Sequence, residues 1–247
     1  MVEPDTSVLS RDARTRLRAV AFVLLAACDV TWYLVAPHLD KVSTWTAIAI
    51  IAAAVLPATL GLIYLALPLW SHRRVVVIGF VVSVTAAVVT WRADAHLASN
   101  FLKLAAYTFG GWAFLWVFEE LSWVVLISLV IPFVDAISVA AGPTHTIVKH
   151  HFEVYSAVAV AFVAPGGAAA GLGPPDILFF ALFLAAAVRW QLRPGWTWLA
   201  MTGAYGLTLV LANATDVSGL PALPFLSFGF LLANCDLLWR RLRPRRA

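Results

Sequence analysis

Charged residues are scarce in this sequence of 247 residues. They make up 12% of the chain, about half the share that an average soluble domain carries, whereas 62% of the residues are hydrophobic. The mean hydropathy is +0.88. This composition excludes an ordinary soluble domain and indicates a polytopic membrane protein whose apolar surface is covered by the bilayer. We expect one all-α transmembrane domain over residues 1–247.

Cysteine and lysine are also rare, and each scarcity excludes a class of protein. The two cysteines, Cys28 and Cys235, lie in apolar segments, so we expect no disulfide framework. A retinal protein would need a lysine in the middle of a span, whereas Lys41, Lys103 and Lys149 lie at or beyond the predicted span ends. The net charge of +4 comes from basic residues at segment ends, which is typical of membrane orientation and leaves no nucleic-acid footprint.

Apolar runs predict about eight transmembrane helices, with nine as the alternative, because a span needs about 20 mainly apolar residues. Pro57 should kink the second helix. The predicted spans are 17–36, 44–69, 75–91, 101–118, 121–141, 176–190, 196–212 and 221–239. Residues 1–120 thus form an N-terminal group of helices, residues 121–239 a second group, and residues 240–247 a basic tail.

Basic clusters predict the orientation of these spans. In an eight-span arrangement the clusters at 11–18, 72–74, 189–193 and 240–246 all fall on one side, which should be cytoplasmic. We therefore expect a multi-pass protein of a prokaryotic plasma membrane with both termini in the cytoplasm. The long connection 142–175 then lies on the outer side, and its β-branched segment 155–163 predicts a short strand.

Two aspartates stand in apolar segments at matching depth. Asp135 lies six residues before the end of span 121–141, about 9 Å below the outer boundary. Span 176–190 covers only about 22 Å of a core that is roughly 30 Å thick, so Asp176 starts about 8 Å below the same boundary. The glycine- and alanine-rich segment 166–173 fills the gap, and irregular backbone at that depth must line a cavity or be buried in protein.

A pair of neighbouring carboxylates is suited to hydrolysis, because two such groups do not easily ionise together and one keeps its proton. The ionised carboxylate activates a water molecule, and the protonated one polarises the scissile carbonyl group. An intramembrane ionisable residue indicates function in its own right. We therefore interpret Asp135 and Asp176 as a catalytic pair. For Asp29, Asp236 and Asn234, a structural role in which they pair with polar groups across helices is as well supported as a functional one.

Three short motifs in this part of the chain resemble one family. Asp135-Ala-Ile-Ser-Val, Gly171-Leu-Gly-Pro-Pro-Asp176 followed by Ile-Leu-Phe-Phe, and Pro221-Ala222-Leu223 at the start of the last span occur in that order. They are similar to the two catalytic segments and the Pro-Ala-Leu motif of presenilin and signal peptide peptidase-like intramembrane aspartyl proteases, particularly the archaeal homologues. The resemblance covers about 110 residues of the chain, from 121 to 239.

The resemblance implies a presenilin-like fold, catalytic Asp135 and Asp176, and substrate contacts from Gly173 and from Pro221, Ala222 and Leu223. It implies a transmembrane peptide as substrate, the lipid bilayer as surroundings, and no cofactor or metal. An outer catalytic loop matches the orientation of signal peptide peptidase. The sequence also departs from the pattern, since Val134 replaces an aromatic residue, Pro175 replaces the glycine before the second aspartate, and one span fewer is predicted.

Other functions stay open at this stage. A proton-coupled transporter or channel also uses paired aspartates and broken helices, although we find no inverted repeat in the sequence. A divergent, inactive homologue is a further alternative. His145, His150, His151 and Glu153 form a polar cluster, but their spacing does not match a zinc motif, and we interpret them as solvated interfacial residues.

Overall fold

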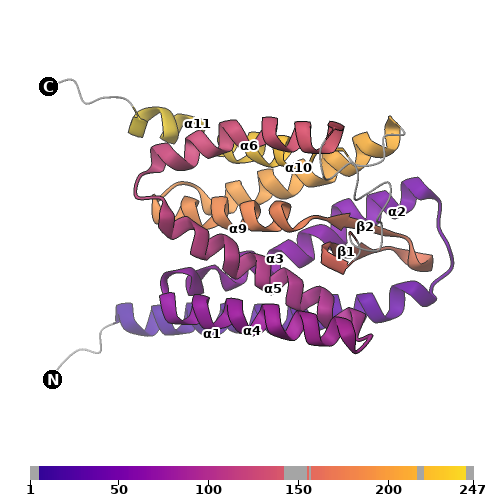
Figure 1. The fold of residues 1–247 in the computed structure, drawn as a ribbon. Coiled ribbons are helices and arrows are strands. Elements are labelled where there is room, and N and C mark those ends of the chain that lie inside the picture. The colour runs from indigo at the N-terminus through magenta and orange to yellow at the C-terminus, as the bar shows by residue number, and fades with distance from the viewer. Residues whose placement is uncertain (1–5, 142–154, 156, 216–219, 243–247) are drawn as a thin grey trace, which may run out of the picture.

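A computed structural model describes residues 6–141, 155, 157–215 and 220–242 of the chain. These residues are mostly helical, as the composition predicts (Figure 1). The long helices are α1 (Thr6–Val35), α4 (Arg73–Arg92), α5 (His96–Phe114), α6 (Leu121–Ala141), α9 (Pro174–Arg189), α10 (Pro194–Ala214) and α11 (Leu223–Leu242). Two shorter helices, α2 (Thr44–Ile50) and α3 (Leu56–Ala66), make up the segment predicted as the second span.

Several helical segments have the properties of membrane spans. Among the described residues, four segments are long and apolar enough to cross a bilayer, namely Ala13–His38, Thr44–Ser71, Arg73–Arg92 and Leu121–Val139. Large apolar side chains on them face outwards, such as Val81, which is 56% exposed, and Leu129, which is 51% exposed. A bilayer is the environment in which such faces are stable, so the chain is a membrane protein.

Helix α9 is the core of the bundle. Every residue from Phe179 to Ala187 is buried, and α5, α10 and α11 pack around this helix (Figure 1). The close contact with α5 depends on Gly111, because a Cβ atom there would lie 2.2 Å from the carbonyl oxygen of Leu178. A helix shielded on all sides can be short, because its ends meet protein instead of lipid.

The predicted kink at Pro57 takes the form of a π-helical turn. Residues Ile51–Val55 form this turn between α2 and α3, and the N–H of Leu56 bonds to the carbonyl of Ile51. Proline has no N–H with which to continue the α-helical hydrogen bonds. In the π-turn just before it, backbone N–H groups bond to the carbonyl five residues earlier instead of four. The second predicted span is therefore one continuous but irregular rod.

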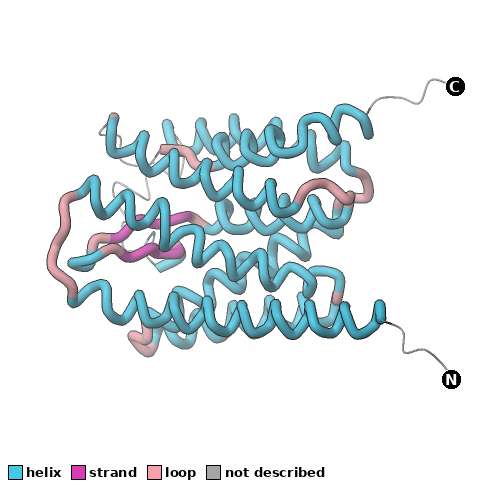
Figure 2. Tube along the Cα trace, turned by 180° about the vertical axis from the view of Figure 1, so that it is seen from behind, coloured by secondary structure: helices cyan, strands magenta, loops and turns pink. Residues whose placement is uncertain are grey.

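A β-hairpin replaces the irregular segment that the sequence predicts before α9. Strand β1 (Val160–Val163) pairs antiparallel with β2 (Ala169–Leu172), and Pro165–Gly167 forms the turn between them. The predicted strand at 155–163 is thus confirmed only for its last four residues. The hairpin lies among the helices at the end of the bundle away from the start of α1 (Figure 2).

Side chains from α1 and α5 cover the outer edge of β1. The Asn100 side chain accepts the N–H of Ala161 at 2.8 Å and donates to its carbonyl at 3.0 Å. The Tyr33 hydroxyl donates to the same carbonyl at 2.6 Å, and the Trp32 indole N–H donates to the Val163 carbonyl at 2.8 Å. Asn100 therefore takes the place of a neighbouring strand.

Lys103 corrects one prediction. It lies inside α5 and is 8% exposed, because the helix starts at His96, earlier than the predicted span. Its ammonium group donates to the carbonyls of Ala159 and Ala157, at 2.6 and 3.3 Å, and lies over the Trp91 ring. A buried cation needs such partners, and the carbonyls just before β1 provide them.

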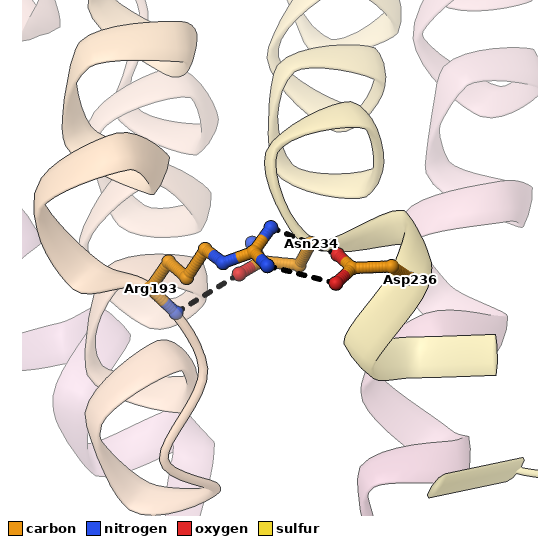
Figure 3. Close-up of polar contacts among 3 residues, drawn as sticks. All are labelled: Arg193, Asn234 and Asp236. Atoms are coloured by element: carbon orange, nitrogen blue, oxygen red, sulfur yellow. Dashed lines mark hydrogen bonds and ion pairs between the residues drawn. The ribbon is translucent and has the colours of Figure 1, made fainter. Parts of the chain in front are cut away.

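The turn between α9 and α10 is fixed to α11 by polar contacts (Figure 3). The Arg193 guanidinium donates to both carboxylate oxygens of Asp236, at 2.8 and 2.7 Å, and its backbone N–H donates to Asn234 at 3.0 Å. Asn234 is fully buried and also donates to Thr197 and Phe230. These contacts favour the structural one of the two roles that the sequence leaves open for Asp236 and Asn234.

Candidate active site

Asp135 lies on the inner face of α6. Its neighbours Phe133, Val134 and Ile137 are 71%, 53% and 68% exposed, whereas Asp135 is partly buried. Helix α6 packs mainly against α11 on that side. The apolar residues around Asp135 in the sequence thus face the bilayer, and the carboxylate faces protein.

The Pro221-Ala222-Leu223 motif meets Asp135 directly. The N–H of Leu223 donates to the Asp135 carboxylate at 3.1 Å, and Leu223 is the first residue of α11. The first N–H groups of a helix have no partner within it, and its positive dipole end favours a negative charge. Ala222 and Leu223 are buried and Pro221 is partly buried, so the motif forms a fixed wall beside the carboxylate.

Asp176 is the third residue of α9, following Pro174 and Pro175. Its carboxylate accepts the N–H of Gly173 at 2.8 Å, which makes it the cap of its own helix. The two prolines suit the first turn, where an N–H would lack a helical partner. Pro175, which replaces the glycine of the family pattern, therefore occupies a helical position that favours proline.

The two aspartates interact electrostatically. Asp135 and Asp176 come from different helices, α6 and α9, and lie close enough for their charges to interact. Tyr205 of α10 lies within electrostatic range of both carboxylates. The tertiary structure therefore brings the predicted pair together.

Tyr205 is a residue of this site that the sequence does not single out. It is 1% exposed, its hydroxyl donates to the backbone carbonyl of Asp176 at 2.8 Å, and its ring stacks near Phe180. A single tyrosine in an apolar span looks like any core aromatic residue, so no local signal marks it. Its bond fixes the first turn of α9, which carries the carboxylate.

Tyr155 is the second such residue. Its hydroxyl donates to the Gly171 carbonyl at 3.0 Å. A Cβ atom on Gly171 would lie 3.1 Å from the Tyr155 hydroxyl oxygen. Burial and the neighbouring charge of Asp176 raise the pKa of Tyr155 to about 12, so the hydroxyl stays a donor throughout the physiological range. Gly171 is thus needed for a close approach to the tyrosine.

The open edge of the hairpin belongs to β2 and leads to Asp176. Ala161 and Val163 direct their backbone groups to α1 and α5, and pairs alternate in an antiparallel ladder, so Ala169 and Gly171 direct theirs away from β1. Both residues are exposed. Side chains of α1 and α5 cover the outer edge of β1, so the predicted strand does not itself offer a free edge.

Gly173 lies two residues after Gly171, so its backbone N–H points away from β1, as those of Ala169 and Gly171 do. Its N–H points to the Asp176 carboxylate, to which it donates, and the residue is partly buried. The row of outward backbone groups along β2 thus ends at the second aspartate. An extended chain paired with this row would reach that carboxylate.

Other acidic and metal-ligating groups stand apart from the pair. Asp29 of α1 is 3% exposed and interacts with Thr59 and Tyr33. Within the part of the chain that the structure describes, no group of three or more His, Cys, Asp or Glu side chains is placed to hold a metal ion. The cluster of His145, His150, His151 and Glu153 lies outside the described residues.

We compared the chain with known protein families, curated proteins and solved structures. The chain matches no family model, no curated protein and no solved structure.

Proposed function

We propose that this protein is an intramembrane aspartyl protease that cleaves transmembrane peptide segments. The observation that carries the proposal is the meeting of Asp135 and Asp176 from separate helices, within range of each other's charge. Each carboxylate accepts one backbone N–H, from Leu223 and Gly173, so each is held in place. Fixed orientation is what a general acid and a general base require.

In the proposed reaction the aspartates share one proton. The ionised carboxylate takes a proton from a water molecule, and the water oxygen bonds to the carbonyl carbon of the scissile peptide. The protonated carboxyl group donates its proton to the carbonyl oxygen, which gives a tetrahedral diol. The diol then collapses: the C–N bond breaks, the leaving nitrogen takes up the proton that the general base received from water, and one diol hydroxyl returns its proton to the other carboxylate, so that the pair again holds one proton.

A helical substrate must unwind before its peptide bond is accessible, and β2 offers a place for the unwound chain. Addition of a strand to an exposed sheet edge uses main-chain hydrogen bonds. Ala169 and Gly171 are exposed, and both backbone groups of Ala169 and the N–H of Gly171 lead to Asp176, whereas the Gly171 carbonyl already accepts from Tyr155. The Pro221-Ala222-Leu223 segment, bonded to Asp135, forms the opposite wall.

The proposal includes a presenilin-like arrangement of eight spans in a prokaryotic plasma membrane. The start of α1 and the end of α11 lie at the same end of the bundle, which agrees with an even number of crossings (Figure 1). Basic residues cluster at that end, which we assign to the cytoplasm. The proposed eight spans include α9, which has only 16 residues but is surrounded by protein and so need not match the thickness of the bilayer core.

Incubation of the purified protein with a model single-span peptide in detergent tests this function. Mass spectrometry should detect two complementary fragments with the wild type and none with Asp176→Ala. Asp236→Ala is the matched control, since it removes a carboxylate that bonds Arg193 away from the pair, and it should cleave normally. Fragments that persist with Asp176→Ala would exclude the proposed chemistry. Absence of fragments with the wild type and four different peptides would favour an inactive homologue.

A further inference from the structure

We propose that the groove between α1 and the end of α3 is a binding site for an anionic phospholipid of the cytoplasmic leaflet. The groove has a volume of about 940 Å³, at the upper end of the roughly 300–1,000 Å³ of small-molecule sites. One wall comes from α1, including Leu17, Phe22 and Val23, and the other from Leu65, Ala66, Pro68 and Leu69. This site is independent of the aspartate pair.

The groove requires an amphiphile as its occupant. Its inner lining is apolar, and Leu17 and Val23 are 70% and 64% exposed, so the wall is open to the hydrocarbon of a bilayer. Arg14 and Arg18 belong to the same lining and lie four residues apart, on one face of α1. Apolar walls with two cations at one end match acyl chains that carry a negative headgroup.

Within the described part of the chain, no residue neutralises the charge of Arg14 or Arg18. Neither Arg14 nor Arg18 forms an ion pair with any residue that the structure describes. Arg18 lies over the Tyr64 ring, with its guanidinium carbon 5.8 Å from the ring centroid. This contact orients the guanidinium and leaves its N–H groups for a phosphate, which arginine binds with paired hydrogen bonds.

A second hollow provides room for the headgroup. It has a volume of about 450 Å³ and shares Arg18 and Pro68 with the first groove. Its lining includes Tyr64, Trp70 and Ser71, and such amphipathic residues are typical of the membrane–water interface. Arg18 thus stands where the chains of a bound lipid would end and its phosphate would begin.

The location agrees with the leaflet in which anionic lipids are abundant. The arginines lie in the first part of α1, at the end of the bundle that we assign to the cytoplasm. Anionic lipids give the cytoplasmic surface its negative potential, and each basic residue near it strengthens binding by about 1 kcal/mol, or about fivefold. Two arginines should therefore favour an anionic over a zwitterionic lipid by about 25-fold.

Native mass spectrometry of the purified full chain tests the proposal, with phosphatidylglycerol and phosphatidylcholine of the same acyl chains added in turn. We expect the wild type to retain phosphatidylglycerol preferentially. The double variant Arg14→Gln/Arg18→Gln should lose about 25-fold in affinity for that lipid and keep its affinity for phosphatidylcholine. Arg74→Gln is the matched control, since it removes an exposed arginine at the start of α4 that does not line the groove.

A second variant tests the acyl part of the site while both arginines remain. Ala19→Trp fills the groove from α1 and should reduce retention of phosphatidylglycerol, whereas Val82→Trp on the outer face of α4 should not. Equal retention of the two lipids by the wild type, or an equal loss with Arg74→Gln, would overturn the proposal. Competition by free glycerol phosphate would assign the arginines to a soluble anion. Loss of a dimer with Ala19→Trp and unchanged lipid would assign the groove to a second copy.

Discussion

The backbone N–H of Leu223 donates a hydrogen bond to the carboxylate of Asp135 at 3.1 Å, although 88 positions separate the two residues. Helix α6 thereby meets the first turn of α11, and a carboxylate satisfies an N–H group that the helix itself leaves without a partner. The same contact turns a short proline-containing motif into a support for the candidate active site. It also gives that motif a function that single substitutions can test.

Leu223→Pro should remove this N–H while keeping a helix start. Proline is favoured in the first turn of a helix, and α9 already begins with two consecutive prolines. We expect cleavage to fall at least tenfold, about the worth of one hydrogen bond to a charged group. The unfolding midpoint should also fall, because proline replaces a buried leucine side chain. Leu223→Ile keeps the N–H and a similar volume, and should retain activity. Equal activity of the two variants would show that the bond does not support catalysis.

Asp135→Asn and Asp176→Asn should each abolish cleavage and leave the fold intact. Asparagine keeps an oxygen that can accept the N–H of Leu223 or Gly173, so the capping bonds survive while the ionisable group is lost. Removal of a buried charge should leave the unfolding midpoint unchanged or slightly higher. Peptide cleavage and thermal unfolding measured on the same preparations check both parts, and residual cleavage by either variant would disprove the paired mechanism.

The pH dependence of cleavage should be bell-shaped if one proton is shared. Below the first apparent pKa of the pair the general base is protonated, and above the second the general acid is lost, so the rate falls on both sides. Rates across the pH range, with unfolding monitored at each value, provide the measurement. A chelator should leave the profile unchanged, whereas activity that follows added zinc would point to the histidine cluster instead.

Ala169→Pro should block the open edge of β2. Its N–H points away from β1, so proline there removes no bond within the hairpin, and Ala168 has φ −61° and ψ 141°, which suits a residue before proline. We expect strong loss of cleavage of a helical peptide, with unchanged binding of a small transition-state mimic at the aspartates. Ala169→Val keeps the N–H and should retain cleavage. Parallel loss of mimic binding would mean that the aspartate site itself is disturbed.

Asn100→Leu should loosen the hairpin. The change leaves the N–H of Ala161 without its partner, and an unsatisfied group of this kind costs about 1–3 kcal/mol. We expect a lower unfolding midpoint and faster amide exchange in β1. Thr108→Val is the control, because this buried α5 hydroxyl bonds only within its own helix, to Leu104. Unchanged exchange in β1 would mean that Asn100 does not hold the strand.

The sequence determined most of the helices. The span predicted at 121–141 coincides with α6, and apolar runs bounded by proline, glycine or charge place most of the other helices to within about five residues. Helix α1 is the exception, because it begins at Thr6, well before the predicted start at residue 17. Such boundaries are local, because a helix satisfies its own backbone within each segment. The depth argument likewise predicts from local sequence that both aspartates lie near the same membrane boundary.

Tertiary structure decided which polar groups meet. The bonds of Asn100 to Ala161, Tyr205 to Asp176 and Leu223 to Asp135 join residues 61, 29 and 88 positions apart. No local pattern carries such pairings. Strand β2 escaped prediction because its sequence, Ala-Ala-Gly-Leu, has no β-branched residue and gains its structure from β1 alone. Strand pairing and buried hydrogen bonds depend on groups from distant segments, so their partners appear only when the helices are packed.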